Sequence, residues 1–229
     1  MSPWISEIKA VFLKEWAVER RAKSGWTTSG AFSFVAVIAV ALAAYGLKLG
    51  EGLAAGMLWV ILLFASVVAL PRCFISEEEQ GTSSLLRLAA RPHAVFWGKA
   101  AFNLIQIAIL GTMITLVYTA MVGVTIVHVG VLLGTLLGGY VALSGTVSVC
   151  GALVAQASQR ESLAGVLALP MLMPVAALGV GGLRYAFGLG TDQAGLTAMG
   201  GLLAYGILQT MAGPWLYAAT HRLHTDEQG

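Results

Sequence analysis

The sequence predicts an all-α membrane protein that crosses the bilayer six times. Of the 229 residues, 58% are hydrophobic and only 10% are charged, which is more apolar surface than one water-facing domain can bury. The charged residues also fall into a few short segments. The apolar stretches between these segments are long enough to cross a hydrocarbon core of about 30 Å as helices. Inside lipid every backbone N–H and C=O group needs an internal partner, so we expect each stretch to be helical.

Three domains are expected along the chain. Residues 1–30 form a cytoplasmic segment, residues 31–219 form the transmembrane domain, and residues 220–229 form a cytoplasmic tail. The six predicted spans cover residues 31–47, 52–70, about 100–121, about 129–155, 163 to about 181, and 196–219. Because the first span begins only after thirty residues, a cleavable signal peptide is not expected.

The basic residues predict the orientation of these spans. Eleven of the thirteen Lys and Arg residues belong to segments on one side, and only Lys48 and Arg184 belong to the other. Basic loops stay in the cytoplasm. Both termini are therefore expected to face the cytoplasm.

An amphipathic helix is predicted before the first span, from residue 3 to about residue 22. Ser2 suits an N-cap, and Pro3 suits the first helical position. Apolar side chains recur at helical spacing and form one face, which contains Trp4, Ile8, Phe12 and Trp16. We expect this helix to lie in the cytoplasmic interface with its aromatic side chains toward lipid. The alternative is a soluble helix that packs on a partner.

The longest polar insertion runs from residue 71 to residue 99, between the second and third spans. Ser76 and Glu79 have capping-box spacing, Gly81 interrupts the helix, and Arg91-Pro92 is expected to end it. We predict short helices that dock a cytoplasmic partner, with the contact residues Glu77, Glu78, Glu79, Gly81, Leu85 and Leu86. The alternative is a solvated loop, although such a loop has no need of a leucine cluster.

Two later spans carry packing signals. In the fourth span, Gly130, Gly134 and Gly138 lie four residues apart, a spacing that lets two helix backbones approach closely. Packing within the chain is the default interpretation, and a dimer seam is the alternative. The fifth span contains Pro170 and Pro174, so we expect it to kink or break in mid-membrane. The freed carbonyls could line a pathway, or the prolines could only shape the packing.

Several kinds of chemistry are disfavoured. No Asp, Glu, Lys or Arg lies within the six predicted spans, which argues against an ion-coupled transporter. Gly98-Lys99 lacks the remainder of a phosphate-binding loop, so the chain is not expected to hydrolyse ATP alone. No catalytic residue, metal site or nucleic-acid site is predicted, because no histidine lies within reach of Ser144 and the two cysteines form no ligand pattern. A permease driven by a separate ATPase fits these exclusions.

The motifs of this chain, taken in order, resemble the heme exporter protein B (CcmB) family, permeases of ATP-binding cassette systems. The resemblance covers nearly the whole chain, and the matching features include a basic N-terminal helix and a Leu-Pro motif in the fifth span. The residues that carry it are Trp16, Glu19, Arg72-Cys73-Phe74, Glu77 to Gly81, Lys99, Leu169-Pro170 and Pro174.

This resemblance implies the ABC-2 (type V) exporter fold, a homodimeric core in the bacterial inner membrane, and a role in cytochrome c maturation. The implied partners are the ATPase CcmA, the membrane proteins CcmC and CcmD, and the heme chaperone CcmE. ATP would bind the partner subunit, and heme would be the cargo of the complex rather than a cofactor of this chain.

The resemblance also assigns ATPase coupling to Glu77, Glu78, Glu79 and Gly81. The family often has an acidic residue just after the glycine, where this chain has Thr82-Ser83-Ser84. His128, on the outer side, is interpreted as a bystander rather than a heme ligand. The alternative functions are an ABC-2 permease for a lipid or another hydrophobic molecule, and a scaffold without transport.

Overall fold

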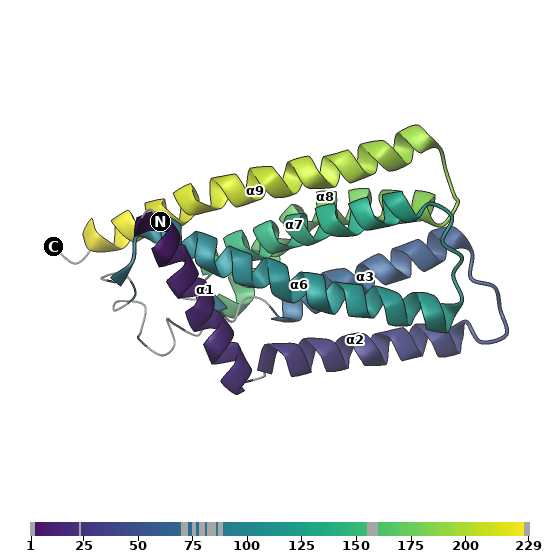
Figure 1. The fold of residues 1–229 in the computed structure, drawn as a ribbon, viewed down its shortest axis with the longest axis horizontal. Helices are drawn as coiled ribbons and strands as arrows, with labels where there is room; N and C mark the ends of the chain where they lie inside the picture. Colours follow the sequence, from purple (N-terminus) through teal and green to yellow (C-terminus); the bar gives the residue numbers. More distant parts are fainter. Residues whose placement is uncertain are drawn as a thin grey trace.

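The computed structural model describes residues 3–22, 24–69, 73–74, 77, 81, 86, 89–154 and 160–226. Within these ranges the chain is all-helical, as the composition predicts. In chain order the helices are α1 (Pro3–Ala22), α2 (Ser24–Ala43), α3 (Glu51–Ala69), α6 (Pro92–Val122), α7 (Val129–Val154), α8 (Arg160–Ala186) and α9 (Asp192–Asp226). Six of these seven helices lie side by side as a bundle, and α1 crosses one end of it (Figure 1).

Five helices in the described part of the chain are long and apolar enough to cross a membrane: α2, α3, α6, α7 and, from Ala168 onward, α8. They correspond to the first five predicted spans. The sixth predicted span lies in α9, a helix of 35 residues that packs along α7 and α8. Glycines, threonines and Gln209 dilute the apolar character of α9, so the count of six spans stays a prediction.

The helix α6 begins at Pro92, about eight residues before the predicted third span. Arg91 is its N-cap, with an extended backbone (φ −67°, ψ 142°), and Pro92 occupies the first turn. Leu86 and Ala89 are helical and Arg91 is not, so the helix before Arg91-Pro92 ends as predicted, but Pro92 also starts a new helix, which was not predicted. A proline suits the start of a helix because its fixed φ is helical and its missing N–H is not needed there. Lys99 consequently lies inside α6, one residue before the predicted third span and within a helix long and apolar enough to cross a membrane.

The helix α8 continues through both of its prolines. The predicted break at Pro170 and Pro174 is therefore absent, although a kink stays a prediction. A proline leaves a carbonyl in the preceding turn without its usual partner, and neighbouring helices can satisfy such groups. Pro174 removes the partner of the Pro170 carbonyl, and at the next residue the Tyr205 hydroxyl on α9 donates to the Met171 carbonyl at 2.9 Å.

The helix α7 lies at the centre and packs against α6, α8 and α9. Two of its three predicted packing glycines face α9: a Cβ at Gly134 would meet Met199, and a Cβ at Gly138 would meet Leu202 and Leu203. Gly130 instead borders open space. The closest backbone approach is at Gly206 on α9, where a Cβ would lie 2.6 Å from the Ala142 nitrogen.

Polar side chains join neighbouring helices inside the bundle. The Asn103 amide donates to Ser148 Oγ at 2.9 Å, and the Ser144 hydroxyl donates to the Ala100 carbonyl at 2.9 Å. Both contacts link α6 to α7. Tyr118 likewise donates from α6 to the Ala54 carbonyl on α3 at 2.9 Å. Such bonds satisfy polar groups where no water is present.

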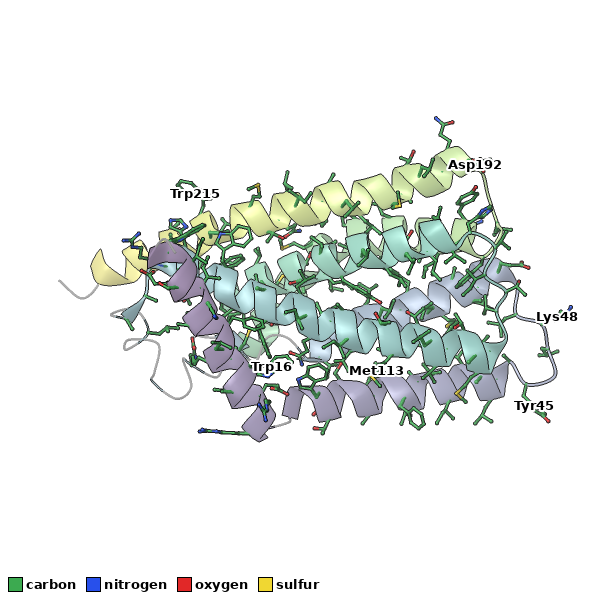
Figure 2. All side chains as sticks on the ribbon, viewed as in Figure 1. Trp16, Tyr45, Lys48, Met113, Asp192 and Trp215 are labelled. Carbon is green, nitrogen blue, oxygen red and sulfur yellow. The ribbon has the colours of Figure 1, made fainter. Side chains whose placement is uncertain are left out.

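The two ends of the bundle differ in character. Both termini lie at the end that α1 crosses (Figure 1). Trp16 and Trp215 mark this end, whereas Tyr45, Lys48 and Asp192 lie at the opposite end (Figure 2). This arrangement matches the grouping of segments on which the predicted orientation rests.

Candidate coupling site at one end of the bundle

The helix α1 packs closely on the first turns of α6. Contact is possible because position 98 is a glycine: a Cβ there would lie 2.7 Å from Val11 Cβ and 3.0 Å from the Ile8 carbonyl oxygen. Val11 is buried in this contact. The small residue therefore determines how near α1 can lie to α6.

The aromatic side chains of α1 are partly used within the protein. Phe12 stacks on Trp16 with ring centroids 6.3 Å apart, and each ring lies 6.4 Å from Phe102 of α6. These two rings were predicted to face lipid, but they pack against α6. The large apolar side chains that α1 leaves exposed are Trp4, Ile5, Leu13 and Val18.

Three carboxylates of α1 each reach a different part of the chain. Glu7 accepts a hydrogen bond from the Arg91 N–H at 3.3 Å, at the start of α6. Glu19 accepts one from the Trp26 N–H at 3.0 Å, in the first turn of α2. A carboxylate is well placed at a helix N-terminus, because the orphan N–H groups there carry partial positive charge. The third carboxylate, Glu15, joins a buried group of charges.

This charged cluster consists of Lys14, Glu15, Glu77 and Lys99, and each lysine contacts both glutamates. Lys14 Nζ lies 3.0 Å from Glu15, Lys99 Nζ lies 3.9 Å from Glu15, and both lysines pair with Glu77. Positive and negative groups therefore alternate around the cluster. Lys99 is fully buried, Glu15 and Glu77 are 5% and 7% exposed, and the Lys14 side chain is half-buried.

The two glutamates have opposite pKa shifts. Burial opposes the charge of Glu77, but the ammonium groups of Lys99 and Lys14 outweigh it and hold the pKa of Glu77 below its ordinary value. For Glu15 burial dominates, and the same two lysines only partly offset it, so its pKa is raised. Glu77 is thus the carboxylate whose charge the cluster stabilises.

Lys99 is also held by the chain segment that contains Glu77. Its ammonium donates to the Cys73 carbonyl and lies 4.6 Å from the centroid of the Phe74 ring. An ammonium can donate three hydrogen bonds and is attracted to an aromatic face. One buried side chain therefore satisfies groups from α1 and from the connection after α3.

An aromatic cluster of Phe74, Phe96 and Tyr217 adjoins the charged cluster through the contact of Phe74 with Lys99. The Phe74 centroid lies 6.2 Å from that of Phe96 and 6.0 Å from that of Tyr217. Glycines make room for these rings: a Cβ at Gly151 on α7 would approach Phe74, and one at Gly213 on α9 would lie 2.1 Å from Phe96 Cζ. The connection after α3 is thus packed on α6, α7 and α9 together.

The Cys73 thiol is not a reactive group. Its Sγ lies 3.5 Å from Asn103 Oδ1, and burial raises its pKa to about 12. The thiolate is the nucleophile and the metal ligand, so this cysteine is unreactive near neutral pH.

The structure describes three of the six residues predicted to couple to an ATPase: Glu77, Gly81 and Leu86. Glu77 is buried in the charged cluster rather than presented to solvent. Gly81 is exposed, with a positive φ of 67° that disfavours residues with a Cβ, and Leu86 packs partly against the aromatic cluster. Glu78, Glu79 and Leu85 lie outside the described residues.

The partnership of Glu15 with Lys99 was not predicted from the sequence. A signal was present, because Glu15 lies four and seven residues after Val11 and Ile8, on the face that packs on α6. A carboxylate on an apolar helix face needs a buried cation, but spacing within α1 could not identify which one.

At the opposite end, His128 stacks on Tyr185 with ring centroids 4.3 Å apart and planes 10° apart, and the Tyr185 hydroxyl donates to Asp192. The Val127 and His128 N–H groups both donate to the Ala186 carbonyl. His128 thus helps to close the turn between α6 and α7 onto α8. Across the described ranges, no group of three or more His, Cys, Asp or Glu residues is placed to hold a metal ion.

The comparisons with known proteins agree with the architecture. The family model described as CcmB protein matches residues 6–223, which is nearly the whole chain and includes every helix named above except the ends of α1 and α9. No curated protein matches the chain. The chain therefore belongs to the CcmB family, the membrane permease component of the heme-export ABC system in cytochrome c maturation.

Proposed function

We propose that this chain is the permease subunit through which a separate ATPase, CcmA, drives heme delivery to the chaperone CcmE. One observation carries the proposal beyond family membership. At the end that α1 crosses, the connection between α3 and α6 is anchored inside the protein by buried ion pairs and aromatic packing. A merely solvated connection does not need a buried charged cluster, whereas one that transmits force to the spans does.

The proposed topology has six spans, with α9 as the sixth and both termini in the cytoplasm. Its support is the basic residues: eleven of the thirteen belong to segments expected in the cytoplasm, and Lys48 lies at the end opposite α1 (Figure 2). In this arrangement α1 lies along the cytoplasmic interface, with Trp4 and Ile5 among the side chains available to lipid. Two copies form the membrane core, together with CcmC and CcmD.

Within the connection between α3 and α6, we assign two different roles. Glu77 anchors the connection, because its carboxylate is buried and paired. Glu78, Glu79 and Leu85 supply the docking surface for the ATPase, and Gly81 supplies the turn next to it. This division departs from the simpler expectation that all three glutamates dock the partner alike.

Co-purification tests the docking role. In the whole complex, reversing the charges of Glu78 and Glu79 together is expected to reduce capture of CcmA by the tagged chain. Reversing Glu51, which starts α3 at the opposite end, is the matched control and should leave capture unchanged. Normal capture and normal ATP turnover with the double reversal would refute the docking assignment.

Deletion of the gene tests the function itself. Cells without this chain are expected to lose c-type cytochromes, measured by heme staining of membrane and periplasmic proteins. Normal cytochrome c maturation in the deletion strain would instead favour export of a lipid or another hydrophobic molecule. ATP hydrolysis by the complex that does not respond to its cargo would favour a scaffold role.

A further inference from the structure

The position of Lys99 points beyond docking. Its ammonium is fully buried and contacts Glu15 of α1, Glu77 of the connection and the Cys73 carbonyl. Lys99 itself belongs to α6, one of the candidate spans. One side chain therefore touches both cytoplasmic elements from within a membrane helix.

The four side chains of the charged cluster either all stay paired or all lose their partners together. It contains two positive and two negative side chains, and each lysine pairs with both glutamates. Withdrawing one partner leaves an uncompensated buried charge, which is strongly unfavourable. Consequently the connection cannot move independently of α1 and α6 unless its charged side chain first reaches water.

Directly after Lys99, hydrogen bonds join α6 to the central helix α7. The next residue, Ala100, accepts a bond from Ser144, and Asn103, one turn further on, donates to Ser148. Both partners lie on α7. A displacement of the first turns of α6 is thus passed directly to α7, which packs on α8 and α9.

We infer that Lys99 is the positioning residue that transmits ATPase-driven motion from the connection and α1 to the membrane helices α6 and α7. This inference rests on the proposed function, because it needs an ATPase that acts on the connection. It separates transmission, through Lys99, from docking, through Glu78 and Glu79.

Lys99→Met in the intact complex tests the inference, because methionine keeps an apolar, unbranched side chain and removes the charge. We expect CcmA to co-purify and to hydrolyse ATP as with the unmodified chain, while cytochrome c maturation falls by about tenfold, within the range typical of coupling between distant sites. Lys48→Met, at the opposite end, is the matched control and should change none of these.

A second variant keeps the inference testable if Lys99→Met does not accumulate in the membrane. Glu77→Gln keeps the shape of the side chain that links the connection to Lys99 but removes its charge, so maturation should fall while CcmA still co-purifies. Full maturation with Lys99→Met, or with a stably folded Glu77→Gln, would overturn the inference.

Loss of CcmA capture with Lys99→Met would also overturn it, because the cluster would then only shape the docking surface. Failure of the proposed function itself is distinguishable, since in that case CcmA would not co-purify with the unmodified chain either.

Discussion

At the scale of single residues, burial decides what each charge can do. A lysine inside a protein is costly unless carboxylates and hydrogen bonds compensate it. Lys99 has both, and the Phe74 ring adds a favourable contact with its ammonium. The half-buried Lys14 completes the alternation from the side nearer to solvent. The cluster therefore holds three segments together without leaving a net buried charge.

The opposite pKa shifts of Glu77 and Glu15 predict unequal effects of two isosteric substitutions. At about pH 7, Glu77→Gln should lower the free energy of unfolding by about 1.5–3 kcal/mol, the range for hydrogen bonds to charged groups. Glu15→Gln should cost less, because burial already disfavours the charge of Glu15 in the folded state. Thermal unfolding of the detergent-purified variants measures the difference.

The pH dependence of this difference has a definite sign. A lowered pKa means that the stability from Glu77 is present above the ordinary value of 4.5 and is lost as the pH falls through the folded-state pKa. The raised pKa of Glu15 acts oppositely, since protonation on acidification relieves a cost. The two variants should therefore converge toward low pH. Equal destabilisation at neutral pH would contradict the assignment of Glu77 as the stabilised carboxylate.

At the scale of helices, glycines determine which pairs approach closely. The α7–α9 pair depends on Gly206, where any Cβ would meet the backbone of Ala142. Between lipid-facing helices there is little hydrophobic driving force, so association depends on close packing and hydrogen bonds. The α1–α6 pair depends in the same way on Gly98, which touches Val11.

A matched pair of substitutions in α9 tests this packing. Gly206→Ala should destabilise the protein by about 1–3 kcal/mol, because the helices must separate to admit the methyl group. Gly200→Ala, in the same helix with no atom near its added Cβ, should cause no loss, since alanine favours helix over glycine. Thermal unfolding in detergent provides the measurement. A similar Tm for both variants would show that the close approach is not needed.

At the scale of the whole molecule, the arrangement of α1 distinguishes the two ends. This helix contacts α6 through apolar packing and reaches α2 through Glu19, so it belongs to the folded unit rather than lying free on a membrane surface. The termini, α1 and the charged cluster gather at one end (Figure 1). A conformational change at that end can thus be transmitted to the helix bundle through buried contacts.

Labelling with a membrane-impermeant thiol reagent tests the orientation. Lys48→Cys, exposed at the end opposite α1, should react from outside intact spheroplasts. Arg21→Cys, exposed at the end of α1, should react only after the membrane is permeabilised. The unmodified chain gives the background of its own two cysteines. Reaction in the reverse order would show that both termini face outward.

Much of this architecture was predictable because hydropathy and backbone hydrogen bonding leave few choices in a bilayer. Long apolar stretches must be helical there, so the bounds of α3 and α7 were predicted to within a few residues. The helices α2 and α6 begin about seven and eight residues before their predicted spans. Those two helices extend into polar sequence, where packing of α1 rather than hydropathy sets the boundary. The family, too, followed from the order of motifs along the chain.

The tertiary structure alone decided which charges are buried and with whom. Glu15, Glu77 and Lys99 are far apart in the chain, and local spacing carries no information about such a meeting. By itself the sequence determined an all-helical membrane protein of the CcmB family, because composition and motif order suffice for that. Only folding brought α1, the connection and α6 together, since a buried charge is stable where its counter-charge is supplied by another segment.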